Sequence, residues 1–198
     1  MNTMTISAEQ VKELRSLTGA GVVDVKKALV ETGGDIQKAV TWLREKGKAS
    51  AAKKGTRQTK EGIIGTYIHS NSKLGVMVAL ACETDFVART EKFQVLARDI
   101  ALHIAAADPL VVKPEEIPES EVEAEKAIAL KQFEGQKKPQ EIMDKIIGGK
   151  LKKYREERAL LTQPFVKNPD QTIGDLIQSA IAELGENITV NDFKRLSL

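Results

Sequence analysis

Residues 63–89 read IIGTYIHSNSKLGVMVALACETDFVAR, and this stretch decides the fold class of the chain. Ile63 to His69 and Leu74 to Cys82 are apolar runs of strand length, and the turn-like segment Ser70-Asn71-Ser72-Lys73 between them predicts a β-hairpin. Apolar residues occupy both faces of the second run, with Val76, Val78, Leu80 and Cys82 on one and Met77, Ala79 and Ala81 on the other. A sheet that is apolar on both faces must be covered on both, which indicates helices on one side and a partner on the other.

After the hairpin the apolar residues follow a helical period. Thr90 is placed to cap a long helix that Asp108-Pro109 ends, and its apolar stripe consists of Phe93, Leu96, Ala97, Ile100, Ala101 and Ile104. A short strand is expected near Phe165-Val166, a helix capped by Thr172 follows, and a last strand covers Ile188 to Leu196. The chain is therefore predicted to have an α+β core over residues 62–198, built on a three-stranded antiparallel sheet with packed helices.

A helical hairpin is predicted to project from this core over residues 113–163. Ser120 and Glu123 have the spacing of a capping box, which would start a helix that runs to Gly135. A second amphipathic helix follows Pro139. Two helices joined by a short turn are typical of an antiparallel pair.

Residues 1–47 predict a separate module of three short helices. Ser7 with Gln10 forms a capping box, and Val11, Leu14 and Leu17 share one face of the first helix. Glycines 19, 21, 33 and 34 separate the helices, Asp35 caps the third, and Gly47 closes it. A core this small predicts marginal stability for the module alone.

Residues 48–61 are expected to be a basic linker or an exposed helical extension. The segment contains Lys48, Lys53, Lys54, Arg57 and Lys60, and residues 48–60 include no acid. The chain as a whole carries a net charge of only +2, so a solvated linker is favoured over a phosphate-binding segment.

Composition and motifs exclude several other classes of protein. No apolar run approaches the ~18–20 residues of a membrane span, and Met1 to Ala8 lacks a signal-peptide pattern, so a cytoplasmic protein is expected. No phosphate-binding glycine loop is present, so direct nucleotide binding is not expected, and no cysteine and histidine spacing suits a metal. No cofactor is predicted.

The expected distances between Cys82 and the two histidines argue against an enzyme that uses Cys82 as its nucleophile. In the hairpin register His69 lies roughly 25 Å from Cys82, and His103 lies about 20 Å along the next helix, by the rise per residue of strands and helices. Cys82 is therefore interpreted as a buried core residue rather than a catalytic thiol.

The segment from Thr84 to Arg89 leaves two alternatives open for its aromatic residue. Thr84 or Asp85 can cap the following helical turn. Phe86 is then either a staple folded onto the core or an exposed anchor, and composition alone favours the buried staple.

Several segments together resemble the elongation factor Ts family. They are Leu14 to Leu29 (LRSLTGAGVVDVKKAL), Cys82 to Arg89 (CETDFVAR), Gln163 to Lys167 (QPFVK) and Gly185 to Ile188 (GENI). The resemblance covers essentially the whole chain and is to the short form of the family, which has a single core domain. It implies a protein that binds elongation factor Tu and promotes release of its GDP for exchange with GTP, that is not an enzyme, and that works as a homodimer.

The resemblance also implies roles for individual residues. Thr84, Asp85, Phe86 and Val87 would disturb Mg²⁺ coordination in the GTPase, with Asp85 and Phe86 wedged against helices beside the magnesium site. Arg15, Val22 and Val23 would dock on the GTPase, where Val22 and Val23 replace longer methionines of the family, and His69 would lie near the partner. The first 47 residues also resemble a ubiquitin-associated fold, and Asn191 to Leu196 lacks the family's second aromatic residue and terminal glycine.

A rival hypothesis is that the chain binds RNA or the ribosome through Lys48 to Lys60. It predicts binding that weakens steeply with salt and is lost when those lysines are neutralised.

Overall fold

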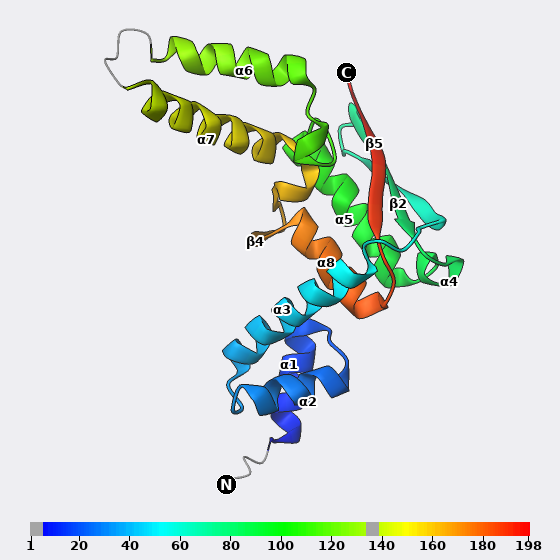
Figure 1. The fold of residues 1–198 in the computed structure, drawn as a ribbon. Coiled ribbons are helices and arrows are strands. Elements are labelled where there is room, and N and C mark those ends of the chain that lie inside the picture. Colours follow the sequence, from blue (N-terminus) through cyan, green and yellow to red (C-terminus); the bar gives the residue numbers. More distant parts are fainter. Residues whose placement is uncertain (1–5, 134–138) are drawn as a thin grey trace. The chain divides into compact units, whose positions relative to one another are not determined.

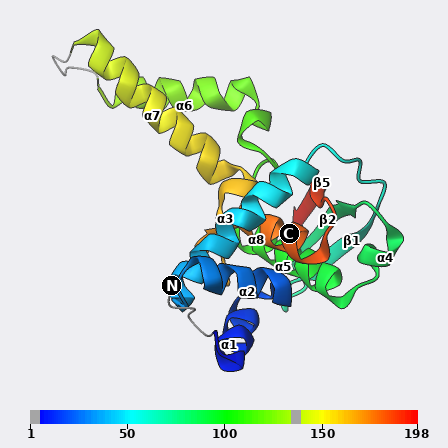
Figure 2. The same cartoon turned by 60° about the horizontal axis from the view of Figure 1, so that its bottom comes forward.

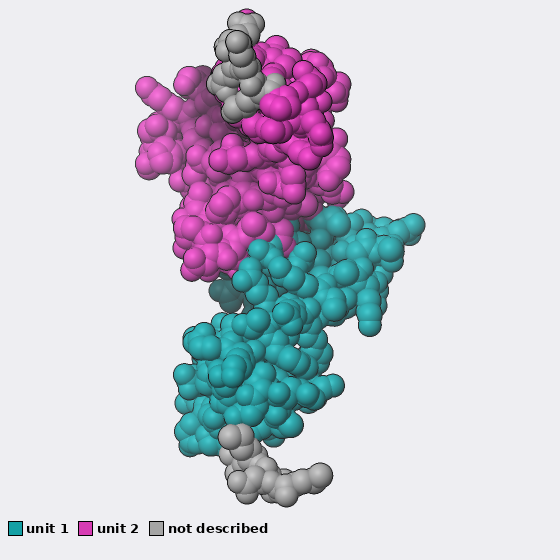
Figure 3. All heavy atoms as spheres, turned by 60° about the vertical axis from the view of Figure 1, so that its left-hand side comes forward, with its two compact units in different colours: residues 1–63, 81–96, 175–189 teal, residues 64–80, 97–174, 190–198 magenta. Residues whose placement is uncertain are grey.

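The computed structural model describes residues 6–133 and 139–198, which form two compact units (Figure 3). Of the described residues, the first contains 6–63, 81–96 and 175–189, and the second contains 64–80, 97–133, 139–174 and 190–198. Each unit combines segments that lie far apart in the sequence. Secondary structure is mixed α and β, as predicted.

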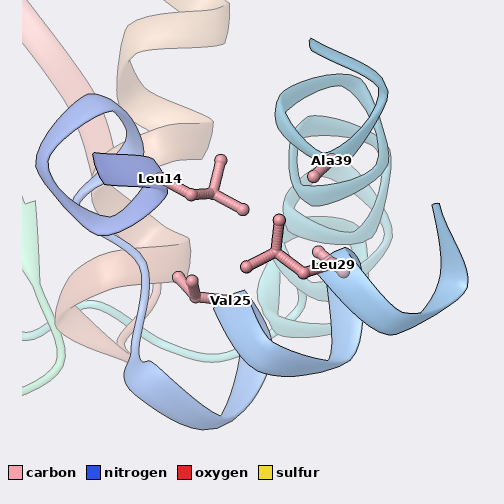
Figure 4. Packing of buried hydrophobic residues seen from close by; sticks show 5 residues of the cluster. Leu14, Val25, Leu29 and Ala39 are labelled. Atoms are coloured by element: carbon pink, nitrogen blue, oxygen red, sulfur yellow. The ribbon is translucent and has the colours of Figure 1, made fainter. Parts of the chain in front are cut away.

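The first unit begins with three helices, α1 (Ala8–Thr18), α2 (Val22–Glu31) and α3 (Ile36–Lys54) (Figure 1). Their shared core consists of five fully buried residues, Leu14, Val25, Ala28, Leu29 and Ala39. Figure 4 shows the side chains of this cluster converging from the three helices. Leu17, which was expected on the same face, is 61% exposed, so that expectation is wrong.

Local interactions fix both ends of α1 and the start of α3 as the sequence predicts. The Ser7 hydroxyl accepts a hydrogen bond from the Gln10 amide at 3.1 Å, and Gln10 Oε1 accepts one from the Ser7 amide at 3.0 Å. The Asp35 carboxylate accepts from the Lys38 amide at 3.0 Å and caps α3. Gly19 ends α1 with φ of 66°, a left-handed conformation that costs glycine little.

Helix α3 does not end at Gly47 as predicted but continues to Lys54. The residues after Gly47 are mainly alanine and lysine, which favour helix strongly enough to carry it through one glycine. Part of the predicted linker is therefore the helical extension that was the other alternative. The division of the chain at residues 47 and 61 concerns independent folding and remains a prediction.

The extension of α3 is tied to α8 (Ile173–Leu184) within the first unit. Asp175 forms ion pairs with Arg44 at 3.1 Å and with Lys48 at 2.9 Å. Further along, the Lys54 ammonium donates to the Ile181 carbonyl at 3.3 Å. Basic residues of the segment therefore serve as internal anchors.

A three-stranded antiparallel sheet lies mostly in the second unit, in the order β1-β2-β5. Its strands are β1 (Glu61–Ile68), β2 (Leu74–Cys82) and β5 (Thr189–Ser197). The predicted hairpin is present, because the His69 amide donates to the Leu74 carbonyl at 2.9 Å across the turn.

One face of this sheet is covered by helix and the other carries exposed apolar side chains. Val76 and Val78 are almost fully buried, and a Cβ on Gly65 would lie 2.8 Å from the Cβ of Ala97 in α5 (Glu91–Ala107). Gly65 therefore allows β1 to approach α5 closely. On the opposite face Ile64 and Met77 are 59% and 54% exposed.

The second unit also contains the predicted helical hairpin, formed by α6 (Glu119–Lys131) and α7 (Gln140–Arg158), which lie side by side in Figures 1 and 2. Tyr154 donates to Glu121 at 3.2 Å and so links the two helices. The predicted capping box is wrong, because α6 begins directly after Pro118 and places Ser120 inside its first turn. Gly135, the predicted end of the first helix, lies outside the described residues.

The remaining elements are short. They are α4 (Asp85–Ala88), β3 (Pro164–Phe165), β4 (Asn168–Thr172) and the 3-10 turns Pro114–Glu116 and Leu160–Thr162.

His103 of α5 is fully buried in the second unit, where its Nε2 pairs with the Gln163 side chain at 3.0 Å and its Nδ1 accepts from the Val166 amide at 3.3 Å.

Candidate partner-binding site

The segment predicted to carry function follows the end of β2 directly. Thr84 caps the single helical turn α4, and its hydroxyl accepts a hydrogen bond from the Val87 amide at 3.4 Å. Ala88 is buried beneath the turn, and Val87 is half-buried. The capping role expected of Thr84 is confirmed.

Phe86 projects from this turn and is 79% exposed. The buried-staple alternative, which composition favoured, is therefore wrong. Phe86 is exposed, as the other alternative requires, and its role as an anchor stays a prediction. Beside Phe86, Asp85 and Arg89 form an ion pair at 2.9 Å across one turn. The result is a large aromatic surface on a helical turn with a charged rim.

The turn is held by a carboxylate from the other end of the chain. Glu186 Oε2 accepts hydrogen bonds from the amides of Glu83 and Thr84 at 3.1 and 3.0 Å, and its Oε1 accepts from the Thr84 hydroxyl at 2.6 Å. Bonds to an ionised acceptor are the stronger kind in proteins.

A second set of bonds runs in the opposite direction. The Glu83 carboxylate accepts from the Asn187 amide at 2.6 Å, and the Asn187 side chain donates to the Arg57 carbonyl at 2.8 Å. Arg57 in turn pairs with Glu83 at 3.4 Å. Asn187 is only 3% exposed, so its polar atoms depend on these partners.

Sequence reasoning missed Glu186 and Asn187 as supports of the site. The segment GENI was noticed only for its resemblance to a family motif, and no local pattern links it to residues 83 and 84. The contact joins residues 102 positions apart, which periodicity does not detect.

Cys82 is not positioned as a nucleophile. Burial, and then the negative charge of Glu186, raise the pKa of the Cys82 thiol, so the reactive thiolate is disfavoured. Its Sγ donates to the Thr84 carbonyl at 3.1 Å, a structural role. In the second unit His103 is occupied by Gln163 and Val166, and burial lowers its pKa.

The N-terminal residues singled out by the resemblance form an exposed face of the three-helix module. Val23 is 80% exposed and Val22 41%, and Arg15 is exposed on α1. A shallow groove of about 470 Å³ lies alongside, lined by Ala8, Val11, Lys12, Arg15, Ser16 and Val22. An apolar patch beside cationic side chains suits an amphipathic protein surface.

His69 lies at the hairpin turn of the second unit and is exposed. Its Nδ1 is 3.1 Å from the Tyr67 hydroxyl, and the two rings lie 6.2 Å apart.

The described residues contain neither a metal-binding cluster nor a helix that could span a membrane. Within residues 6–133 and 139–198, no group of three or more histidine, cysteine or acidic side chains is arranged to hold a metal ion. In the same part of the chain no helix combines the length and apolar character that crossing a membrane requires.

Comparison with known proteins identifies the family. The family model described as elongation factor TS matches residues 3–198. The chain is 51% identical over 195 residues to elongation factor Ts of Syntrophus aciditrophicus, covering 98% of this chain and 97% of that protein. It is 52% identical to the Thermodesulfovibrio yellowstonii protein over the same coverage, and 49% identical to the Rubrobacter xylanophilus protein over 98% of this chain and 100% of that one. The chain therefore belongs to the elongation factor Ts family, whose members are translation elongation factors.

Proposed function

We propose that this chain is a guanine-nucleotide exchange factor that binds elongation factor Tu in its GDP form and promotes release of the GDP during translation elongation. The main support for the proposal is the exposure of Phe86, an aromatic residue that is 79% exposed on a capped and hydrogen-bonded turn. Aromatic residues, phenylalanine among them, are enriched in protein interfaces relative to the rest of the surface.

The exchange reaction needs no chemical step. A protein that binds the nucleotide-free GTPase best must weaken nucleotide binding by the same factor with which nucleotide weakens its own binding. The chain is then not an enzyme, needs no cofactor and does not itself bind nucleotide. Cytoplasmic localisation follows from this role.

Residues Thr84 to Val87 form the part that acts on the nucleotide site. Phe86 and Asp85 wedge between GTPase elements beside the bound magnesium, and the disturbed cation no longer neutralises the GDP phosphates. Arg15, Val22 and Val23 form a second docking surface on the three-helix module. The exposed hairpin residue His69 also lies near the partner.

The open face of the sheet supports a homodimer. Ile64 and Met77 expose apolar surface on a sheet whose opposite face is covered by α5. Burial of such a face against a second copy removes that surface from water. Sedimentation at micromolar concentration should give the mass of a dimer, and a monomer there would contradict this part of the proposal.

Release of labelled GDP from elongation factor Tu tests the main proposal. Catalytic amounts of the chain should accelerate release, and Phe86→Ala should reduce the acceleration at least about tenfold, as loss of a central interface anchor does. Ile128→Ala provides a control, because Ile128 is also an exposed apolar residue, at 52%, but lies on the helical hairpin. No acceleration by the wild type would refute the exchange function, while full activity of Phe86→Ala would refute only the wedge.

A further inference from the structure

The exposed turn that carries Phe86 cannot be stable through its own backbone bonds. Helix α4 has only four residues, and isolated helices of fewer than ~12 residues are marginal in water. Holding each backbone residue in one conformation costs about 1–2 kcal/mol at 25 °C. Interactions from outside the segment must therefore supply its order.

Glu186 supplies three of these interactions. One carboxylate accepts the amides of Glu83 and Thr84 and the Thr84 hydroxyl, at distances of 2.6 to 3.1 Å. The same Thr84 hydroxyl caps the turn by accepting the Val87 amide. Glu186 thus orients the cap on which the turn depends.

Asn187 completes the connection from the next position in the chain. Its amide donates to Glu83 at 2.6 Å, and its side chain donates to the Arg57 carbonyl at 2.8 Å. Residues 83, 84 and 57 are in this way fixed to one turn after α8. None of these bonds uses the exposed face of Phe86.

We propose that Glu186 and Asn187 are positioning residues for exchange, which hold residues 83–87 in the conformation that presents Phe86 to the GTPase. This inference rests on the proposed exchange function. Order that is established during folding does not have to be created on binding, so the binding energy of Phe86 is available to distort the nucleotide site.

A double-mutant cycle between positions 186 and 86 tests the inference. GDP release should be measured over a range of concentrations for wild type, Glu186→Ala, Phe86→Ala and the double variant, which gives the maximal rate and the half-saturating concentration. Glu186→Ala should lower the maximal rate about tenfold in the wild-type background and less than about twofold when Phe86 is absent, because coupled residues are not additive.

A purely structural role gives a different pattern. If Glu186→Ala only reduced general stability, the unfolding midpoint would fall. The exchange rate would then decrease by the same factor whether or not Phe86 is present. Amide hydrogen exchange adds a direct readout, since protection at Glu83 and Thr84 should fall at least about tenfold in Glu186→Ala. Asp99→Ala is the matched control, because Asp99 is a partly buried carboxylate that pairs with Lys167 at 2.6 Å in the second unit.

Glu186→Gln covers the case in which the alanine variant does not fold. The amide keeps one oxygen for the two backbone donors but loses the charge, so a smaller reduction of the same kind is expected, again absent without Phe86. Equal effects of either variant in both backgrounds, or no effect at all, overturn the positioning inference. If wild type itself fails to accelerate release, the exchange function fails first and the inference fails with it.

Discussion

The two surfaces proposed to meet the GTPase are held in place by different forces. The face formed by Arg15, Val22 and Val23 belongs to helices packed on five fully buried apolar residues. The turn that carries Phe86 depends on hydrogen bonds from Glu186 and Asn187. One surface is therefore supported by apolar packing and the other by directed polar contacts.

The two kinds of support predict different responses of the two surfaces to substitution. Packing is shared among many contacts, so an exposed residue of the helical face can be changed without disturbing its neighbours, whereas a core residue cannot. A polar support consists of a few bonds, and removing one acceptor leaves several donors without a partner. The predictions below test these two behaviours.

The largest effect is expected from the core of the three-helix module. Leu14→Ala should destabilise the module by about 3–5 kcal/mol, because Leu14 is fully buried in a small core. Amide hydrogen exchange should then show loss of protection in α1, α2 and the first half of α3, with protection retained in β2 and α5. Global unfolding of the chain would show instead that residues 1–47 are not a separate folding module.

The helical face itself should tolerate change without loss of stability. Val23→Asp should weaken binding to elongation factor Tu about tenfold or more, since it places a charge in an apolar contact. Its unfolding midpoint should remain that of the wild type, because Val23 is 80% exposed. Titration calorimetry with Ile128→Asp as the control checks this, and unchanged affinity would exclude Val23 from the interface.

A buried histidine extends the comparison to another polar support. Val166 donates to His103 Nδ1, and burial lowers the pKa of His103 below its ordinary value of 6.5. As the pH falls below 6.5, His103 becomes protonated in the unfolded chain but stays neutral in the folded chain. The free energy of unfolding should therefore fall by up to about 1.4 kcal/mol for each pH unit of acidification. Urea unfolding between pH 7.5 and 5.5 gives the free energy of unfolding as a function of pH. The decrease with falling pH should be smaller in His103→Gln than in wild type, and an equal decrease in both would exclude His103 as its source.

The ion pair at the rim of Phe86 is expected to contribute very little to stability. The ion pair between Asp85 and Arg89 is exposed and contributes at most about 0.5 kcal/mol. Arg89→Ala should therefore leave the unfolding midpoint unchanged within about 1 °C. A large loss of exchange activity in this variant would then identify Arg89 as a direct contact with the partner.

Local features of the fold were predictable from the sequence. The capping box of Ser7, the cap of Asp35 and the hairpin at residues 70–73 each depend on residues within a few positions, and all are present. The errors at Gly47 and Ser120 arose where a neighbouring preference was stronger, namely the alanines that extend α3 and the proline that starts α6 two residues early.

The candidate site was predictable only in part. The cap at Thr84 follows from local chemistry. The exposure of Phe86 depends on whether distant segments pack over it, and the spacing of apolar residues in the sequence does not show this. Leu17 was misplaced for the same reason, since a three-residue spacing does not show where the apolar face of a helix ends. The supports at Glu186 and Asn187 were missed because their contacts span more than 100 positions.

That long separation has a consequence for how the protein is made. At the usual 5–20 residues per second, the ribosome adds Glu186 roughly 5–20 s after Thr84, which lies 102 positions earlier. Until then the Phe86 segment lacks its acceptor, so a nascent or truncated chain displays the aromatic on an unordered loop. The time at which Glu186 is added therefore sets the earliest point at which the Phe86 segment can become ordered.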